Sequence, residues 1–188
     1  MSRWEPDARG RLERAALALF GERGFENTTV AEIAERAGLT ERTFLRYFTD
    51  KREVLFAGAA ALQDLLVNAV VDAPGSAAPI DAIAGALEAA AVVLGERRDY
   101  SLQRQTVIAA NSELQERELI KLATLASGIA DALRQRGVTD PAAALAAEAG
   151  IAVFKIAFER WISESNPRDL SELVRDSFDQ MRAVTMGA

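Results

Sequence analysis

Residues 36–52 carry five basic side chains against two carboxylates, which gives this stretch a net charge of +3. The seven residues are Arg36, Arg42, Arg46, Lys51 and Arg52, with Glu41 and Asp50. The chain as a whole is acidic, with a net charge of −6, because residues 1–52 carry +1 and residues 53–188 carry −7. An acidic protein with a local basic patch can still bind a polyanion when its acidic part lies away from that patch.

Neither cysteine nor histidine occurs among the 188 residues. Without cysteine there is no disulfide, thiol nucleophile, zinc ribbon or iron–sulfur cluster. Without histidine there is no Ser–His–Asp triad and no imidazole metal site. An all-carboxylate Mg²⁺ or Ca²⁺ site remains chemically feasible, but most common acid–base catalysis is excluded. We therefore expect a protein that is not an enzyme, with no catalytic residue, no metal ligand and no cofactor.

The basic stretch falls on two predicted short helices joined by a glycine turn. Thr29 and Glu32 have the spacing of a capping box, and they begin a helix that Gly38 ends. Thr40 caps the second helix, residues 41–47. A second helix of this kind can lie in a DNA major groove, although an ordinary αα-corner has the same pattern. Its outward face carries Glu41, Arg42, Thr43, Leu45 and Arg46.

Helical periodicity continues through the whole chain, with breaks at glycine and proline. No strand or internal repeat is recognisable, so we predict an all-α fold. Residues 72–79, with two prolines and a glycine, form the clearest linker. No targeting segment and no uninterrupted apolar run of ~20 residues is present, so we expect a cytoplasmic protein with no membrane partner. The predicted helices span residues 7–23, 30–37, 41–47, 51–71, 80–97, 100–110, 113–135, 141–164 and 168–185.

Residues 24–44, GFENTTVAEIAERAGLTERTF, followed by Arg46, Tyr47, Phe48 and Lys51, resemble the signature of the tetracycline-repressor (TetR) family of bacterial regulators. The resemblance extends from roughly Arg11 to Leu55. It implies a three-helix helix-turn-helix DNA-binding domain over residues 1–52, followed by a helical ligand-binding and dimerisation domain over residues 53–188.

The resemblance also implies which residues contact the DNA backbone. Backbone amides at the helix ends capped by Thr29 and Thr40 would bind phosphates. The Tyr47 hydroxyl would bind the backbone as well. Lys51, in the first turn of the next predicted helix, would hold a phosphate with its ammonium.

Base recognition is assigned to the outward face of the second helix in the same way. Arg42 and Arg46 are the best candidates, because a guanidinium matches the O6 and N7 atoms of guanine. Thr43 would touch a base or a methyl group, and Glu41 would accept from cytosine or only cap its helix. Leu45 departs from the family, which often has tyrosine there; an apolar contact with a thymine methyl would replace the phosphate contact.

The family resemblance implies a small-molecule effector in the second domain. Residues 111–117 and 158–161 are similar to a TetR subgroup that senses acyl-CoA-like ligands. Eleven residues are candidates to line an apolar cavity, although each is equally suited to filling the core. They are Leu87, Ala91, Leu94, Leu102, Thr106, Leu122, Leu125, Ile129, Phe154, Phe158 and Trp161.

The last two predicted helices carry an apolar stripe that a single chain would leave in water, so we expect a homodimer. The candidate interface residues are Leu145, Ala149, Ala152, Ile156, Leu170, Leu173, Val174, Phe178 and Met181. The expected mechanism is a two-state dimer on a palindromic double-stranded DNA operator, with half-sites about one duplex turn (~34 Å) apart. Effector binding would swing the helix 51–71 and release the DNA, and repression is the expected sense. An all-α small-molecule-binding protein or enzyme with the helix-turn-helix as scaffold, and a helical adaptor, are the alternatives.

Overall fold

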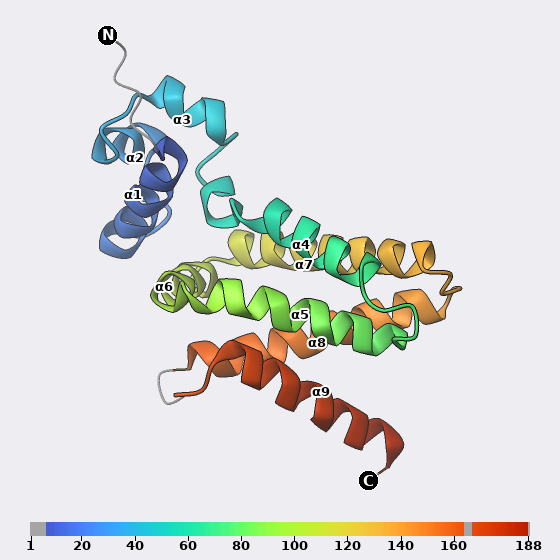
Figure 1. The fold of residues 1–188 in the computed structure, drawn as a ribbon. Helices are drawn as coiled ribbons and strands as arrows, with labels where there is room; N and C mark the ends of the chain where they lie inside the picture. The colour runs from blue at the N-terminus through green and yellow to red at the C-terminus, as the bar shows by residue number, and fades with distance from the viewer. Residues whose placement is uncertain (1–6, 164–166, 188) are drawn as a thin grey trace. The chain divides into compact units, whose positions relative to one another are not determined.

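The computed structural model describes residues 7–163 and 167–187, and every regular element in these two ranges is a helix, as predicted (Figure 1). The described residues divide into two compact units. The first unit contains the chain up to Ala59 together with Leu102–Glu118, and the second contains Ala60–Ser101 and the residues from Leu119 onward. Helices α6 (Arg98–Ala109) and α7 (Ser112–Gln135) therefore contribute residues to both units.

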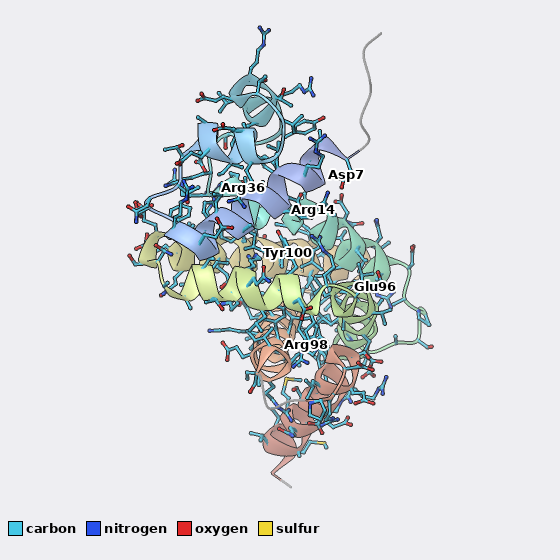
Figure 2. All side chains as sticks on the ribbon, turned by 90° about the vertical axis from the view of Figure 1, so that its left-hand side faces the viewer. Asp7, Arg14, Arg36, Glu96, Arg98 and Tyr100 are labelled. Carbon is cyan, nitrogen blue, oxygen red and sulfur yellow. The ribbon has the colours of Figure 1, made fainter. Side chains whose placement is uncertain are left out.

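The first unit is built on α1 (Ala8–Arg23), α2 (Val30–Arg36) and α3 (Glu41–Tyr47). Asp7 caps α1 by accepting from the Gly10 amide, and its carboxylate also pairs with Arg14 at 3.2 Å (Figure 2). Leu12, Leu19, Ile33 and Phe44 are almost completely buried between the helices, and the rings of Phe44 and Phe48 pack 5.4 Å apart. These apolar contacts pack the three helices together, as the spacing of the apolar residues predicts.

The turn between α2 and α3 depends on Gly38. The Gly38 amide donates to Glu35 O and the Leu39 amide donates to Ala34 O, which is the Schellman arrangement. Gly38 has a φ of 66°, a left-handed conformation that glycine adopts without strain. A Cβ at this position would also lie 2.7 Å from Nη2 of Arg11, whose guanidinium donates to Ala37 O. The predicted glycine turn is confirmed.

The prediction of one long helix over residues 51–71 is wrong about where the helix begins. Residues Glu53–Phe56 form a 3₁₀ turn, η1, and the α-helix α4 (Ala59–Val71) begins only after Gly58. The carbonyl groups of Leu55 and Ala57 accept from the side chains of Arg104 and Arg9, so they are drawn away from the α-helical ladder. Glycine at position 58 adds to the break because it is a poor helix former.

The second unit packs α4, α5 (Pro79–Gly95), α8 (Ala142–Ile162) and α9 (Leu170–Met186) with most of α7. Helices α5, α8 and α9 lie side by side and contact one another (Figure 1). The predicted linker between α4 and α5 is confirmed. Arg136 donates to two of its carbonyl groups, those of Ala73 and Pro74, and to those of Val70 and Val71 at the end of α4. Glu164, the predicted end of α8, lies outside the described residues.

Four of the predicted dimer-interface residues belong instead to the core of the second unit. Leu170, Leu173, Val174 and Phe178 are each at most 1% exposed, since α9 turns them toward α5 and α8. The expectation that a single chain would leave them in water is therefore wrong. The 3.6-residue periodicity of the sequence correctly predicts the apolar face of α9, but it does not indicate which helices pack against that face. Of the predicted interface residues, Leu145 and Ile156 on α8 are the large apolar side chains that are open to solvent, at 66% and 53% exposure.

One helical segment of the described chain, Glu53–Val71, is long and apolar enough to cross a membrane by length and composition. Core helices of soluble proteins meet the same test, so this is weak evidence. The segment is interrupted by Gln63, Asp64 and Asn68, and its Leu66 and Val70 side chains are at most 1% exposed in the core of the second unit.

Substitution of glycine by alanine is expected to have opposite effects on stability at two helical positions of the second unit. A Cβ on Gly150 would lie 2.5 Å from Cγ2 of the fully buried Ile83, whereas nothing lies within 4 Å of a Cβ on the exposed Gly85. We expect Gly150→Ala to lower the free energy of unfolding by about 1–3 kcal/mol through overpacking. We expect Gly85→Ala to raise it by about 0.5–1 kcal/mol through helix propensity. Urea unfolding of the two variants measures both, and equal shifts would contradict the close approach of α5 and α8.

Candidate nucleic-acid interface

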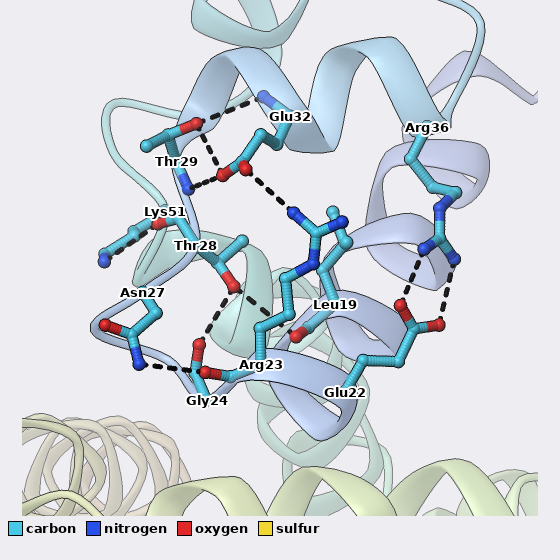
Figure 3. A network of polar contacts seen from close by, with 10 residues as sticks. All are labelled: Leu19, Glu22, Arg23, Gly24, Asn27, Thr28, Thr29, Glu32, Arg36 and Lys51. Atoms are coloured by element: carbon cyan, nitrogen blue, oxygen red, sulfur yellow. Dashed lines mark hydrogen bonds and ion pairs between the residues drawn. The ribbon is translucent and has the colours of Figure 1, made fainter.

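The predicted capping box at the start of α2 is present in full (Figure 3). The Thr29 hydroxyl accepts from the Glu32 amide at 3.2 Å, and the Glu32 carboxylate accepts from the Thr29 amide at 2.8 Å. Arg23 from α1 reaches the same carboxylate at 2.9 Å. The hydrogen bond from the Thr29 amide is the main reason why the pKa of Glu32 lies below its ordinary value. The start of α2 is thus held to the end of α1 by polar contacts.

Helix α3 has one buried side and one exposed side, as predicted. Phe44 is completely buried, and the Thr40 hydroxyl caps the helix by accepting from the Thr43 amide at 3.2 Å. The Thr40 and Thr43 hydroxyls also lie 2.9 Å apart, so Thr43 is committed to the cap. The outward side carries Glu41, Arg42, Leu45 and Arg46, all exposed, with Leu45 54% exposed.

The side chain of Arg42 makes no hydrogen bond or ion pair with any residue in the described ranges, and neither does the side chain of Glu41. Arg46 donates to the Tyr47 hydroxyl at 3.2 Å, and its guanidinium carbon lies 5.0 Å from the centre of the Tyr47 ring. Tyr47 is itself 41% exposed. No carboxylate in the described part of the chain pairs with either arginine, so both charges remain available to an anionic partner.

Lys51 is placed differently from the sequence-based expectation of a free phosphate ligand (Figure 3). Its ammonium donates to three carbonyl groups of the loop between α1 and α2, those of Phe25, Glu26 and Thr28, at 2.8, 3.3 and 3.0 Å. Nζ also lies 4.4 Å from the centre of the Phe25 ring. An ammonium has three protons, so the loop takes all of them. In the structure, Lys51 fixes the loop that leads into α2.

The remaining two cations of the basic stretch are neutralised locally. The Arg36 guanidinium pairs with both oxygens of Glu22, at 3.1 and 2.7 Å, and this pairing is the main reason why the pKa of Glu22 is lowered. Arg52 pairs with Asp50 at 3.0 Å. Of the five cations counted in the sequence, Arg36 and Arg52 are thus paired with carboxylates and Lys51 is held by loop carbonyl groups. Arg42 and Arg46 are left exposed on α3 without a carboxylate partner in the described chain.

The lowered carboxyl pKa values predict how stability depends on pH. Native Glu22 and Glu32 hold their protons less tightly than the unfolded chain does, so the contribution of these carboxylates to stability is complete above their ordinary pKa of 4.5. It is lost as the pH falls through the lowered native values. The chain has no histidine, so we expect the melting temperature to be nearly constant between about pH 6 and 8. The melting temperature should fall in acid. In circular-dichroism melts, Glu32→Gln should show a shallower acid dependence; an unchanged one would contradict this assignment.

Nine of the eleven effector candidates come together in the core of the second unit. Six are buried there, and Leu94, Leu122 and Phe158 are partly buried against them. The Phe158 ring lies 5.9 Å from the Phe154 ring and 5.6 Å from the Trp161 ring. The buried six are Leu87, Ala91, Leu125, Ile129, Phe154 and Trp161.

The other two effector candidates, Leu102 and Thr106, belong to the first unit, and Thr106 is exposed, with its hydroxyl bonded to Leu102 O. The lining role of all eleven residues remains a prediction. A shallow open hollow of about 240 Å³ lies between α7 and α8, and of the eleven candidates it contains Leu122. Its lining combines Leu119 and Ile151 with the charged residues Glu148 and Lys155.

Sequence reasoning missed several residues that organise the first unit. Thr28 is 1% exposed, and its hydroxyl donates to Gly24 O at 2.9 Å, which secures the end of α1 (Figure 3). A threonine directly before the capping Thr29 gives no local signal for this role. Arg104 from α6 and Arg117 from α7 also contact η1. They lie 49 and 64 residues from their partners along the chain, so no local sequence pattern predicts these contacts.

Comparison with known protein families identifies the class of this protein. The family model described as bacterial regulatory proteins of the tetR family matches residues 13–57. The model described as the MftR C-terminal domain matches residues 77–185, more than half of the chain. The chain belongs to the TetR family of transcriptional regulators.

Individual relatives agree with this assignment. TcmR of Streptomyces glaucescens, a helix-turn-helix transcriptional regulator, is 39% identical over 95 residues, which are 50% of this chain and 41% of that protein, less than half of TcmR's length. FadR of Thermus thermophilus, solved with lauroyl-CoA, has a TM-score of 0.57 at 23% identity and 93% coverage of both chains. SmeT, which represses the SmeDEF multidrug efflux pump of Stenotrophomonas maltophilia, has a TM-score of 0.64 at 21% identity and coverages of 94% and 89%. At these identities the two solved structures establish a shared fold.

Proposed function

We propose that this protein is a ligand-responsive transcriptional repressor that binds a palindromic DNA operator as a homodimer. The observation that carries the proposal is the exposed side of α3, where Arg42 and Arg46 project without a carboxylate partner in the described chain. The buried Phe44 and the Thr40 cap hold that side rigid. A rigid short helix that presents two guanidinium groups fits guanine edges in a major groove.

In this proposal the other exposed residues contact the backbone and the neighbouring bases. Thr29 and Thr40 would place the helix-end amides near phosphates, and the Tyr47 hydroxyl would donate to a third phosphate. Leu45 would contact a thymine methyl, and Glu41 and Thr43 would lie beside the bases. Backbone contacts of this kind fix the register of the helix on the duplex but carry no sequence information.

The experiment that tests the proposal is an electrophoretic mobility shift with the intergenic DNA upstream of the gene, at low salt. The proposal predicts a shifted complex that a competing duplex of scrambled sequence does not remove. Folded protein that gives no shift would contradict DNA binding and would favour an all-α small-molecule-binding protein or enzyme that uses the helix-turn-helix as scaffold.

We further propose a small apolar or acyl-type effector that binds within the second unit and releases the DNA. The aromatic cluster of Phe154, Phe158 and Trp161 offers an apolar wall, and the solved FadR relative holds lauroyl-CoA. The effector must bind the DNA-competent and DNA-released states with unequal affinity, because otherwise no population shifts. A protein of this function works in the cytoplasm, beside the DNA.

Trp161 provides an intrinsic probe of the effector site. The chain has two tryptophans, Trp4, which lies outside the described residues, and Trp161, which is 2% exposed in the second unit. In a Trp4→Phe background we expect lauroyl-CoA to change the emission of Trp161 and to raise the melting temperature of the protein. Stabilisation without any change in emission would place the effector away from the aromatic cluster.

A further inference from the structure

Glu41 is the one acidic residue of α3, and it is exposed on the side of the helix that carries Arg42 and Arg46. Its carboxylate makes no hydrogen bond or ion pair with any residue in the described ranges. Its own helix offers no cation, because the residues three and four positions further on are Phe44 and Leu45. Glu41 therefore brings an uncompensated negative charge to the surface that is proposed to meet DNA.

The start of α3 does not use the Glu41 carboxylate as a cap. The Thr40 hydroxyl accepts from the Thr43 amide at 3.2 Å and performs that role. At the start of α2, by contrast, the acidic residue of the first turn is engaged within the protein, since Glu32 accepts from the Thr29 amide at 2.8 Å (Figure 3). The two helices begin with similar residues, but the carboxylate of α3 is left open to a partner outside the chain.

A DNA duplex presents few favourable partners to such a carboxylate. Phosphates carry one negative charge per ~1.7 Å of the helix axis, and they repel an anion that enters the major groove. Guanine and thymine present acceptor atoms there, and adenine presents an acceptor beside its amino group. Cytosine presents its N4 amino group, a donor from which a carboxylate can accept. The guanidinium groups of Arg42 and Arg46, in contrast, are attracted to phosphates in every sequence.

We propose that Glu41 is a specificity-determining residue that weakens binding to every duplex that does not place a cytosine opposite it. This inference rests on the proposed DNA-binding function. Two guanidinium groups and one carboxylate give the exposed side of α3 a net charge of +1, so removal of the carboxylate doubles its net positive charge. In the operator the contact with cytosine offsets the repulsion by phosphates. Specificity of this kind is a penalty on the wrong partners.

The test compares the full-length wild type with Glu41→Gln on the labelled intergenic duplex and on a scrambled duplex. We expect the variant to bind the scrambled duplex about tenfold more tightly and the intergenic duplex with a change of at most about threefold. On the scrambled duplex, the slope of log affinity against log salt should become steeper by about 0.9 per chain. The melting temperature should not change, because the carboxylate has no partner in the described chain.

A second comparison identifies the base pair that Glu41 meets. Each C·G pair of a half-site is replaced in turn by T·A in the intergenic duplex. At one pair the wild type should lose roughly tenfold in affinity, and the loss should disappear in Glu41→Gln. Glu41→Ala repeats the comparison without an amide that can bind adenine. The matched control is Glu96→Gln, which removes one exposed carboxylate of the second unit and should leave the preference between duplexes unchanged.

Three results would overturn the inference. One is equal tightening on both duplexes, or tightening no greater than that of Glu96→Gln, which would show a general effect of charge. Another is weaker binding of the intergenic duplex with unchanged binding of the scrambled one, because Glu41 would then only attract. The third is a half-site in which no C·G pair depends on Glu41. A wild-type protein that binds no duplex would instead refute the proposed function.

Discussion

Arg42→Ala is expected to abolish most of the preference of the protein for its operator. Loss of a bidentate contact to guanine costs about 1–3 kcal/mol of discrimination at one base pair. A dimer makes the contact in both half-sites, so the loss is roughly 2–6 kcal/mol, at least about thirtyfold in affinity. Arg42 has no internal partner in the described chain, so its removal costs the fold little. Fluorescence anisotropy with operator and scrambled duplexes measures the effect.

The same assay separates base recognition from general attraction. The proposal predicts that binding of the scrambled duplex changes far less than binding of the operator. Arg134→Ala, which removes an exposed arginine of the second unit, serves as the control for the loss of one positive charge. Equal losses on operator and scrambled duplexes would show that Arg42 contributes charge only.

Lys51→Met is expected to act through the fold, with little direct effect on phosphate binding. Its ammonium holds three loop carbonyls, and hydrogen bonds to charged groups are worth about 1.5–3 kcal/mol each when buried. The site is half-buried, so we expect the free energy of unfolding to fall by about 2 kcal/mol in urea. Operator and scrambled duplexes should both bind more weakly, because the loop that leads into α2 loses its support.

Salt dependence distinguishes this role from the phosphate contact that the family resemblance implies. A lysine on a phosphate contributes about 0.9 to the slope of log affinity against log salt in each half-site. If the ammonium stays on the loop carbonyls, Lys51→Met leaves that slope nearly unchanged. A slope reduced by about 0.9 per half-site, with unaltered stability, would place the ammonium on the DNA.

The sequence was sufficient for the features that form within four or five residues. The Thr29–Glu32 box, the Thr40 cap and the Gly38 turn each satisfy backbone groups of their own helix, so their spacing alone predicts them. These features fix the position of α3 along the chain and the side of α3 that faces outward. That is why the exposed side of α3 could be predicted from the sequence, whereas its DNA contacts stay a prediction.

Features that depend on distant partners were missed. The sequence gives no sign that the Lys51 ammonium is engaged within the protein, because the three carbonyl groups that accept from it lie 23–26 residues away. The break before α4 depends on Arg9 and Arg104, which are 48 and 49 residues from their acceptors. The α9 stripe was found correctly, but its partners are α5 and α8 of the same chain. Periodicity identifies an apolar face and cannot say which surface covers it.

The most direct test of whether α3 of each protomer in a symmetric dimer recognises DNA has two parts. Duplexes are selected from a random pool, and the mass of the selected complex is then measured by sedimentation. The account predicts that the selected duplexes share an inverted repeat, with half-site centres about 10 base pairs or a multiple apart. Each such duplex would carry at least two chains, and Arg42→Ala would not retain it. A pool that shows no enrichment, or a complex of one chain on a sequence without symmetry, would contradict the account.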